Sequence, residues 1–120
     1  MATIQAIIST TDFDRLLRFY QQAFDATEFQ RVPEKGKVFF VGLTVGDSEL
    51  GLVVNEKSTP GDQQQRILLS IDVPDVDSAL ARIEPAGGTV LGPPNDMPWG
   101  QRVAHCTDPD GNKINITTWI

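Results

Sequence analysis

The chain has 120 residues, which fits one compact domain that buries roughly two thirds of the surface of its unfolded chain. Its formal net charge of −6 argues against a nucleic-acid-binding protein, because phosphates demand a basic face. No stretch approaches the ~18 apolar residues of a membrane span, and a single cysteine excludes an internal disulfide and a multi-cysteine zinc site. The first five residues lack the basic and apolar segments of a secretory signal, so we expect a cytoplasmic protein with no membrane or nucleic-acid partner.

The first half of the chain predicts one helix among four strands. Residues 4–8 alternate in the period of two that is typical of a strand. Asp12 supplies N-cap chemistry for a helix over residues 13–23, whose apolar side chains follow helical spacing. Three further strands are predicted at residues 28–31, 37–43 and 49–55.

A polar segment with helix and strand breakers, residues 57–65, predicts a linker between two parts of about 1–56 and 66–120. The second part begins with an alternating strand over residues 66–73. A short helix that ends near Ile83 follows, with Asp75 or Asp77 as its N-cap. The remaining predicted elements are a strand at 89–91, an irregular proline-rich loop at 92–100, and a hairpin of strands 102–107 and 113–119.

The two parts read as copies of one β-α-β-β-β unit. The pattern Asp-x-Asp-x-x-Leu occurs at Asp12 and recurs at Asp75, an offset of 63 residues, and the turn glycine Gly46 recurs at Gly111, an offset of 65. Such a duplication predicts a single α+β domain, residues 1–120. Its curved mixed sheets, mostly antiparallel, carry their helices on the outer face and enclose a cleft.

Three motifs resemble the vicinal oxygen chelate superfamily of glyoxalase I, extradiol dioxygenases, and fosfomycin- and bleomycin-resistance proteins. They are residues 12–20, residues 75–80, and the turn 108–112 that leads into residues 114–116. The resemblance covers nearly the whole chain and implies the two-repeat fold. It does not imply one reaction, because this scaffold carries metal enzymes as well as plain binding proteins.

In metal-using members, the ligands come from the first and last strand of each repeat. The resemblance maps those positions onto Gln5, Gly51, Leu68 and Asn115. These residues supply two neutral amides, a hydrogen and an isobutyl group, whereas catalytic divalent metals are held by imidazole, carboxylate or thiolate. We therefore expect no metal site, no cofactor and no catalytic residue.

His105 is the chain's one histidine, and the sequence leaves two interpretations open for it. It is either a strand histidine bonded to a neighbour or an acid or base that faces the cleft, because its side relative to Asn115 depends on the register of the final hairpin. Cys106 follows directly. Adjacent strand residues point to opposite faces, so we exclude a Cys-His dyad and expect a buried, inert thiol.

The predicted cleft lining is mostly neutral, which suits an organic ligand held by apolar walls and a few hydrogen-bonding groups. Trp99 is the strongest candidate for ligand contact, because an aromatic on this loop commonly stacks on ligand rings in the antibiotic-binding proteins that the chain resembles. The alternative is that the Trp99 side chain packs into the core and anchors its own loop there. The full set of candidate ligand-binding residues is Trp99, Gln5, Leu68, Asn115, Ser70, Met97, Arg102 and His105.

The leading interpretation is a metal-independent binding protein that resembles the bleomycin-resistance type. We expect it to be a homodimer that holds a small organic ligand, aromatic or cationic. The alternative is a glyoxalase-like lyase or dioxygenase with an atypical metal site, which Gln5 keeps open. An accessory domain without a small-molecule role is the third class. Whether the repeats pair within one chain or are exchanged between two stays open.

Overall fold

The computed structural model describes residues 4–57 and 67–120. The chain divides into two compact units, residues 1–59 and 60–120. Most of the predicted linker, and the predicted start of the second repeat at residue 66, lie outside the described residues.

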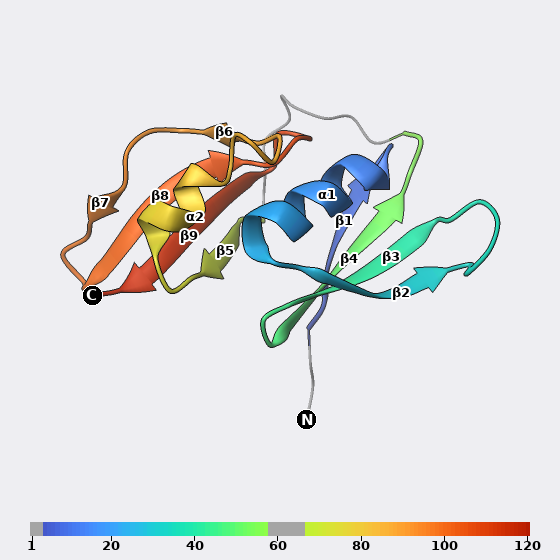
Figure 1. Cartoon of the computed structure of the whole chain (residues 1–120), viewed down its shortest axis with the longest axis horizontal. Coiled ribbons are helices and arrows are strands. Elements are labelled where there is room, and N and C mark those ends of the chain that lie inside the picture. Colours follow the sequence, from blue (N-terminus) through green and yellow to red (C-terminus); the bar gives the residue numbers. More distant parts are fainter. Residues whose placement is uncertain (1–3, 58–66) are drawn as a thin grey trace. The chain divides into compact units, whose positions relative to one another are not determined.

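Unit 1 contains one helix and one four-stranded mixed sheet (Figure 1). Its elements in chain order are β1 (Ala6–Thr10), α1 (Phe13–Phe24), β2 (Thr27–Val32), β3 (Phe40–Val45) and β4 (Ser48–Val54). The strands lie in the order β1-β4-β3-β2, with β1 parallel to β4 and the other pairs antiparallel.

The helix α1 begins and ends where its capping residues require. The Asp12 carboxylate accepts a hydrogen bond from the backbone N–H of Asp14, and Asp25 ends the helix in the left-handed conformation with a φ of 56°. Leu16, Leu17 and Tyr20 are buried against the sheet. The predicted helix is confirmed to within one residue.

Strand alternation gives the sheet of unit 1 a covered face and an open face. Ile7, Gly51 and Gly42 are aligned across three neighbouring strands and belong to the open face. The covered face is apolar and packs against α1, and its buried strand residues are Val41, Leu43, Leu50 and Leu52.

Unit 2 repeats the plan with one additional short strand. The sheet order is β5-β9-β8-β6, with β7 paired to β8, and again the first strand lies parallel to the last. Its elements are β5 (Leu69–Asp72), α2 (Val76–Ala81), β6 (Thr89–Val90), β7 (Asn95–Asp96), β8 (Gln101–Thr107) and β9 (Lys113–Trp119). The helix α2 packs against β8 and β9 and covers one face of the sheet.

The structure identifies Asp75 as the N-cap of α2. Its carboxylate accepts hydrogen bonds from the backbone N–H groups of Asp77 and Ser78, while the Asp77 side chain bonds Arg102 instead. The Ser78 N–H and hydroxyl, in that order, lower the pKa of Asp75. The helix ends at Ala81, before the predicted end near Ile83, although Ile83 is fully buried.

The prediction of an irregular loop over residues 92–100 was wrong at two residues. Asn95 and Asp96 pair with Val103 and Arg102 of β8 and form β7. Asparagine and aspartate are depleted in strands, so the sequence carried no strand signal there. These two residues form a strand because their backbone pairs with the edge of β8.

The final hairpin is confirmed, and Asp108 organises its turn. The backbone N–H of Gly111 donates to the carbonyl of Asp108 at 2.9 Å, as the turn prediction requires. The Asp108 carboxylate also accepts from the backbone N–H groups of Asp110 and Asn112, each at 3.0 Å. The turn fixes the register of β8 against β9, which determines what each face of the sheet carries.

Both units are open mixed sheets with one helix each, as the two-repeat α+β prediction requires. In the described part of the chain, no helix is long and apolar enough to cross a membrane.

Candidate functional site

The open face of unit 2 carries a line of polar side chains across three strands. Ser70 of β5 is aligned with Asn115 of β9, and Asn115 is aligned with His105 of β8. Aligned residues of neighbouring strands point to the same side of a sheet. We call these three residues, Ser70, Asn115 and His105, the polar row.

Two members of the polar row are hydrogen-bonded to each other. Nδ1 of His105 lies 2.7 Å from Oδ1 of Asn115, and the imidazole is exposed. The pairing places His105 on the same face as Asn115, which sequence reasoning left open. The two interpretations of His105 therefore do not exclude each other, because the ring bonds a neighbour and also lies on the open face.

Two residues further along β5 and β9, the aligned pair Asp72 and Thr117 adds a carboxylate to the same face. Asp72 of β5 accepts a hydrogen bond from the Thr117 hydroxyl of β9 at 3.2 Å, and Asp72 itself is exposed. Lys113, two residues before Asn115 on β9, shares its face by strand alternation. The polar row is thus flanked along the strands by one negative and one positive side chain.

An apolar side chain lies next to the polar row at its β5 end. Leu68, directly before β5, is 51% exposed. It precedes Ser70 by two residues and therefore lies on the same side of the chain. Leu68 adds an apolar surface beside the three hydrogen-bonding groups, a combination typical of small-molecule sites.

Trp99 lies at the other end of β8. Its indole Nε1 donates to Oε1 of Gln101 at 2.8 Å. Trp99 is 62% exposed, so its side chain does not pack into the core. Gln101 shares the face of His105 but precedes it by four strand residues, about 13 Å. Met97 shapes the turn that carries Trp99, since its backbone N–H donates to the Gln101 carbonyl.

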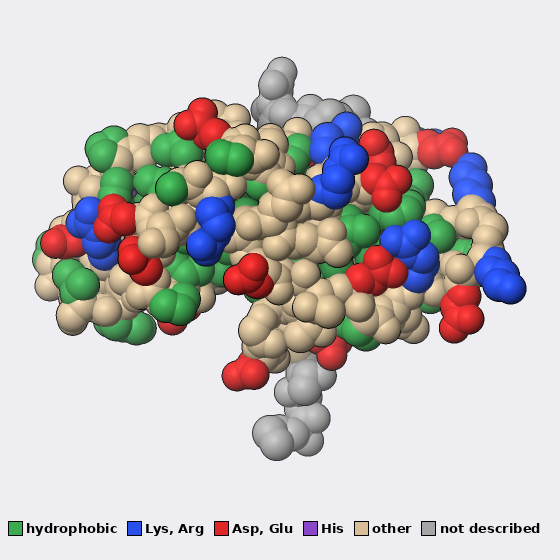
Figure 2. Space-filling view, viewed as in Figure 1, with side chains coloured by type: hydrophobic (Ala, Val, Ile, Leu, Met, Phe, Trp, Pro, Cys, Tyr) green, Lys and Arg blue, Asp and Glu red, His purple; other side chains and the backbone are tan. Residues whose placement is uncertain are grey.

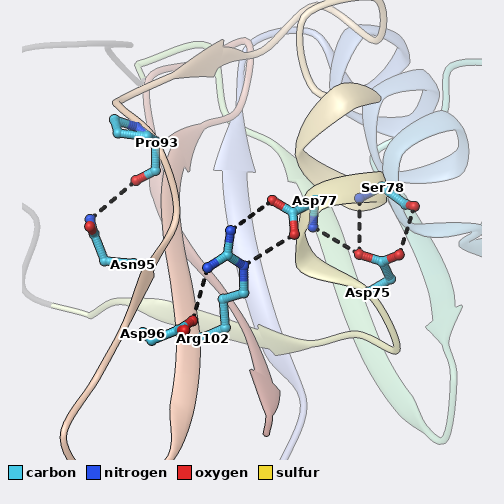
Figure 3. A network of polar contacts seen from close by, with 7 residues as sticks. All are labelled: Asp75, Asp77, Ser78, Pro93, Asn95, Asp96 and Arg102. Atoms are coloured by element: carbon cyan, nitrogen blue, oxygen red, sulfur yellow. Dashed lines mark hydrogen bonds and ion pairs between the residues drawn. The ribbon is translucent and has the colours of Figure 1, made fainter.

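Arg102 lies on the opposite, helix-covered face and is not brought together with the polar row (Figure 3). Its guanidinium donates from Nε and Nη2 to the two carboxylate oxygens of Asp77, each at 3.1 Å, and from Nη1 to Asp96 at 2.9 Å. The hydrogen bonds to Asp77 and then to Asp96 raise the pKa of Arg102 above its usual range. The three side chains link α2, β7 and β8.

Cys106 is also on the helix-covered face, where it is fully buried as a free thiol. Burial, and secondarily the negative charge of Asp108, raises the pKa of Cys106 to about 12. Because His105 is exposed on the other side of the sheet, the exclusion of a Cys-His dyad is confirmed.

In unit 1, two of the positions that the family motifs mark lie at the open face. Gln5 directly precedes β1, and its amide Nε2 donates to Oε1 of Glu49 at 3.4 Å. At Gly51, an added Cβ would lie 2.8 Å from the Phe40 ring and 3.2 Å from the side chain of Ile7. The space that a ligating side chain needs at this position is therefore filled.

Sequence reasoning missed two phenylalanines on this open face. Gly42 and Gly51 are aligned across β3 and β4, and the ring of Phe29 covers Gly42 as that of Phe40 covers Gly51. Phe29 is 48% exposed. Glycine inside a strand marks close approach of another group, and this signal was available in the sequence.

The residues present do not fit a catalytic divalent metal. In residues 4–57 and 67–120, no group of three or more His, Cys, Asp or Glu side chains is placed to hold an ion. At the positions that the motifs mark, Leu68 and Gly51 carry no donor atom, and Asn115 Oδ1 is bonded to His105. This donor set lacks the anionic and imidazole groups that such metals require.

The surface charge is mixed. On the face of the molecule drawn in Figure 2, basic and acidic side chains lie interspersed and form no patch of one sign. That face therefore offers no basic surface of the kind that nucleic acid requires.

Known proteins match the chain over most of its length. It is 28% identical to the uncharacterized protein YraH of Bacillus subtilis over 97% of both chains. It is also 30% identical to the uncharacterized protein Mb0911c of Mycobacterium bovis, over 82% of this chain and 70% of that protein.

Solved structures share the fold as well. A glyoxalase/bleomycin resistance protein/dioxygenase family enzyme of Burkholderia phytofirmans aligns with a TM-score of 0.79 at 26% identity, over 97% of each chain. TioX of Micromonospora aligns with a TM-score of 0.77 at 21% identity, over 99% of this chain and 97% of TioX. The fosfomycin resistance protein FosX of Mesorhizobium loti aligns at 0.73 and 16% identity, over 100% and 92%.

The family model of the Glyoxalase/Bleomycin resistance protein/Dioxygenase superfamily matches residues 3–116. This match agrees with the duplicated β-α-β-β-β topology and with the motifs at Asp12, Asp75 and Asp108. The chain belongs to the Glyoxalase/Bleomycin resistance protein/Dioxygenase superfamily.

Proposed function

We propose that this protein is a metal-independent small-molecule binding protein of its superfamily, similar in role to the bleomycin-resistance type. The polar row supplies hydrogen bonds to the ligand, Leu68 supplies apolar surface, and Trp99 supplies an aromatic face. On the open face of unit 1, Gln5 offers an amide of its own. Arg102 has no part in the proposal, because its guanidinium is engaged on the opposite face of the sheet.

One observation supports the absence of a metal above all others. Of the four positions where metal-using members carry ligands, Gly51 is covered by the Phe40 ring and Leu68 is aliphatic. The other two, Gln5 and Asn115, are neutral amides already bonded to Glu49 and His105. Sequestering a ligand needs no catalytic group, so this chemistry suits binding. Among the contacts of residues 4–57 and 67–120, none favours the alternative, a glyoxalase-like lyase or dioxygenase.

The ligand we propose is a small organic molecule, aromatic or cationic. Exposed aromatic side chains are present on both units, at Phe29 and at Trp99, and aromatic faces attract planar rings and cations. The net charge of −6 favours the approach of cations. The proposal includes a homodimer in the cytoplasm, where the one cysteine is kept as a buried free thiol.

A thermal-shift screen of aromatic amines, aminoglycosides, glycopeptides and planar dyes, run with and without a chelator, tests the proposal. Binding raises the melting temperature in proportion to occupancy. We expect at least one compound to stabilise the protein equally under both conditions. A stabilising compound that acts only when divalent metal is present would contradict the metal-independent mechanism.

Trp99→Ala tests the aromatic contact with any compound that the screen identifies. We expect its affinity to fall about tenfold, roughly 1.4 kcal/mol, because a stacked ring is lost while the fold is unchanged. The matched control is Phe39→Ala, which removes an exposed aromatic side chain directly before β3 of unit 1. In Trp119→Phe, which removes the chain's other tryptophan, titration by fluorescence isolates Trp99 emission. Equal affinity in Trp99→Ala and in the unmodified protein would remove Trp99 from the site.

A further inference from the structure

The contact between His105 and Asn115 fixes more than the position of the imidazole. Oδ1 of Asn115 is a carbonyl oxygen and can only accept a hydrogen bond. At 2.7 Å, Nδ1 of His105 must therefore carry the proton of this bond. In a neutral imidazole only one nitrogen is protonated, so Nε2 is left with its lone pair.

Neighbouring strands hold Asn115 in place for this role. Its backbone lies in the middle of the sheet, between β5 and β8, and is aligned with Ser70 on one side and His105 on the other. The flanking residues Ile114 and Ile116 are fully buried on the covered face. The amide of Asn115 thus extends from a fixed position, while the imidazole that it contacts is exposed.

We propose that Asn115 holds His105 as the Nδ1–H tautomer, so that the open face of unit 2 presents an unprotonated Nε2 as a hydrogen-bond acceptor. Free imidazole side chains in water prefer the opposite tautomer, with the proton on Nε2, so the contact reverses the intrinsic preference. The acceptor selects ligands that bring an N–H or O–H group, such as amines and phenols, over anions that have only acceptors. This last step rests on the proposed ligand-binding function, whereas the tautomer does not.

The tautomer is measured directly by long-range proton–nitrogen correlation spectra of the imidazole in the full chain. His105 is the one histidine, so its signals need no assignment. At a pH where imidazoles are neutral, we expect a pyrrole-type signal for Nδ1 and a pyridine-type signal for Nε2. Asn115→Leu has a side chain of similar size but no acceptor. In this variant we expect a pyridine-type signal for Nδ1 and a pyrrole-type signal for Nε2. In Asn115→Asp, which retains an acceptor, we expect the pattern of the unmodified protein.

A pyrrole-type Nε2 in the unmodified protein, or an unchanged pattern in Asn115→Leu, would overturn the inference while leaving the proposed binding function standing. The selection step is tested with three probes of similar size: phenol, benzylammonium and benzoate at high millimolar concentration. We expect phenol and benzylammonium to shift the Nε2 signal and benzoate to leave it unchanged. An equal shift with benzoate, or no shift with any probe, would contradict the acceptor role.

Discussion

Cys106 illustrates how its neighbours determine the chemistry of a single residue. The thiol is fully buried on the covered face of the unit 2 sheet, aligned with Ile114 of β9 and Val90 of β6. A cysteine is a nucleophile only as the thiolate, and burial raises the pKa of Cys106 to about 12. We predict that thiol reagents at pH 8 leave the native protein unmodified and react with one equivalent after unfolding in guanidinium. Complete reaction of the native protein within minutes would show that the thiol is accessible.

The raised pKa of Cys106 also predicts that the free energy of unfolding depends on pH. Because the folded pKa of Cys106 is raised above the ordinary value of 9.0, the folded state holds the proton more tightly than the unfolded state. The stabilising contribution is complete below pH 9 and decreases as the pH rises from 9 toward 12. We expect the stability difference between the unmodified protein and Cys106→Ala, measured by urea unfolding, to decrease from pH 8 to pH 10.5. A stability difference that stays constant between pH 8 and pH 10.5 would contradict the raised pKa of Cys106.

Asp108 has a larger structural role than its place in a surface turn suggests. It is 2% exposed, and its carboxylate accepts from two backbone N–H groups and from the side-chain amide of Asn112. We predict that Asp108→Ala costs about 2–3 kcal/mol of unfolding free energy, since buried donors lose their acceptor. The matched control is Asp47→Ala in the turn between β3 and β4, where the side chain is exposed. Equal effects of the two substitutions would contradict this role of Asp108.

At the scale of elements, the guanidinium of Arg102 joins three segments of unit 2. It bonds Asp77 of α2 with two hydrogen bonds and Asp96 of β7 with one (Figure 3). We predict that Arg102→Ala lowers the melting temperature by a few degrees. Arg102→Lys should recover little of the loss, because an ammonium lacks the planar, two-point geometry.

The effect on stability should be separate from ligand binding, since Arg102 lies on the face opposite the polar row. Lys37→Ala is the control, because its ion pair with Glu56 joins two side chains that are more than 80% exposed and is expected to contribute little. A large loss of ligand affinity in Arg102→Ala, with unchanged melting temperature, would return Arg102 to the ligand site.

Element types were predictable wherever local chemistry decides them. The caps Asp12 and Asp75, and the turn at Asp108, are each satisfied by hydrogen bonds within four residues in sequence, and the types of the elements that they bound were predicted correctly. Pairing between distant residues was not predictable in this way. β7 forms by pairing with the edge of β8, and the Asp77 side chain bonds Arg102, which lies 25 residues away in the chain.

The candidate site was predictable only in part, for the same reason. Alternation placed Ser70 and Asn115 on one face, but the contact of His105 with Asn115 requires the register of β8 against β9. Arg102 was predicted as a ligand contact, although it lies three residues from His105 on one strand and therefore points to the opposite face. Its partners there, Asp77 and Asp96, come from other elements. The glycines at 42 and 51, each inside a strand, indicate that another group lies close to the backbone, but that Phe29 covers Gly42 depends on the irregular register of β2, which no local pattern reveals.

At the scale of the whole molecule, the duplicated units share a topology and differ in the chemistry of their open faces. Equivalent positions on the last strands hold Gly51, covered by an aromatic ring, in unit 1 and Asn115, bonded to histidine, in unit 2. Neither position supplies an anionic or imidazole donor. The chain thus shares the fold of its superfamily, while the chemistry at these two positions differs between its repeats.

The account depends on matching positions of this chain to the metal ligands of the metal-using members. Placing metal ligands at the matched positions tests that matching. The double variant Leu68→His and Asn115→Glu supplies an imidazole and a carboxylate at the two marked positions of unit 2, beside His105. We expect it to bind one divalent ion per chain at micromolar concentration, by calorimetric titration. A folded double variant without metal affinity would show that the positions are matched incorrectly.

The most direct test of the central claim is a calorimetric titration of the unmodified, chelator-treated chain with nickel, zinc, manganese and iron(II), followed by metal analysis of the purified protein. The account predicts no stoichiometric binding of any of the four ions, because in residues 4–57 and 67–120 no three His, Cys, Asp or Glu side chains are grouped to hold one. One tightly bound equivalent of any of these metals per chain would contradict it and would make a metal-dependent reaction the better explanation of this fold.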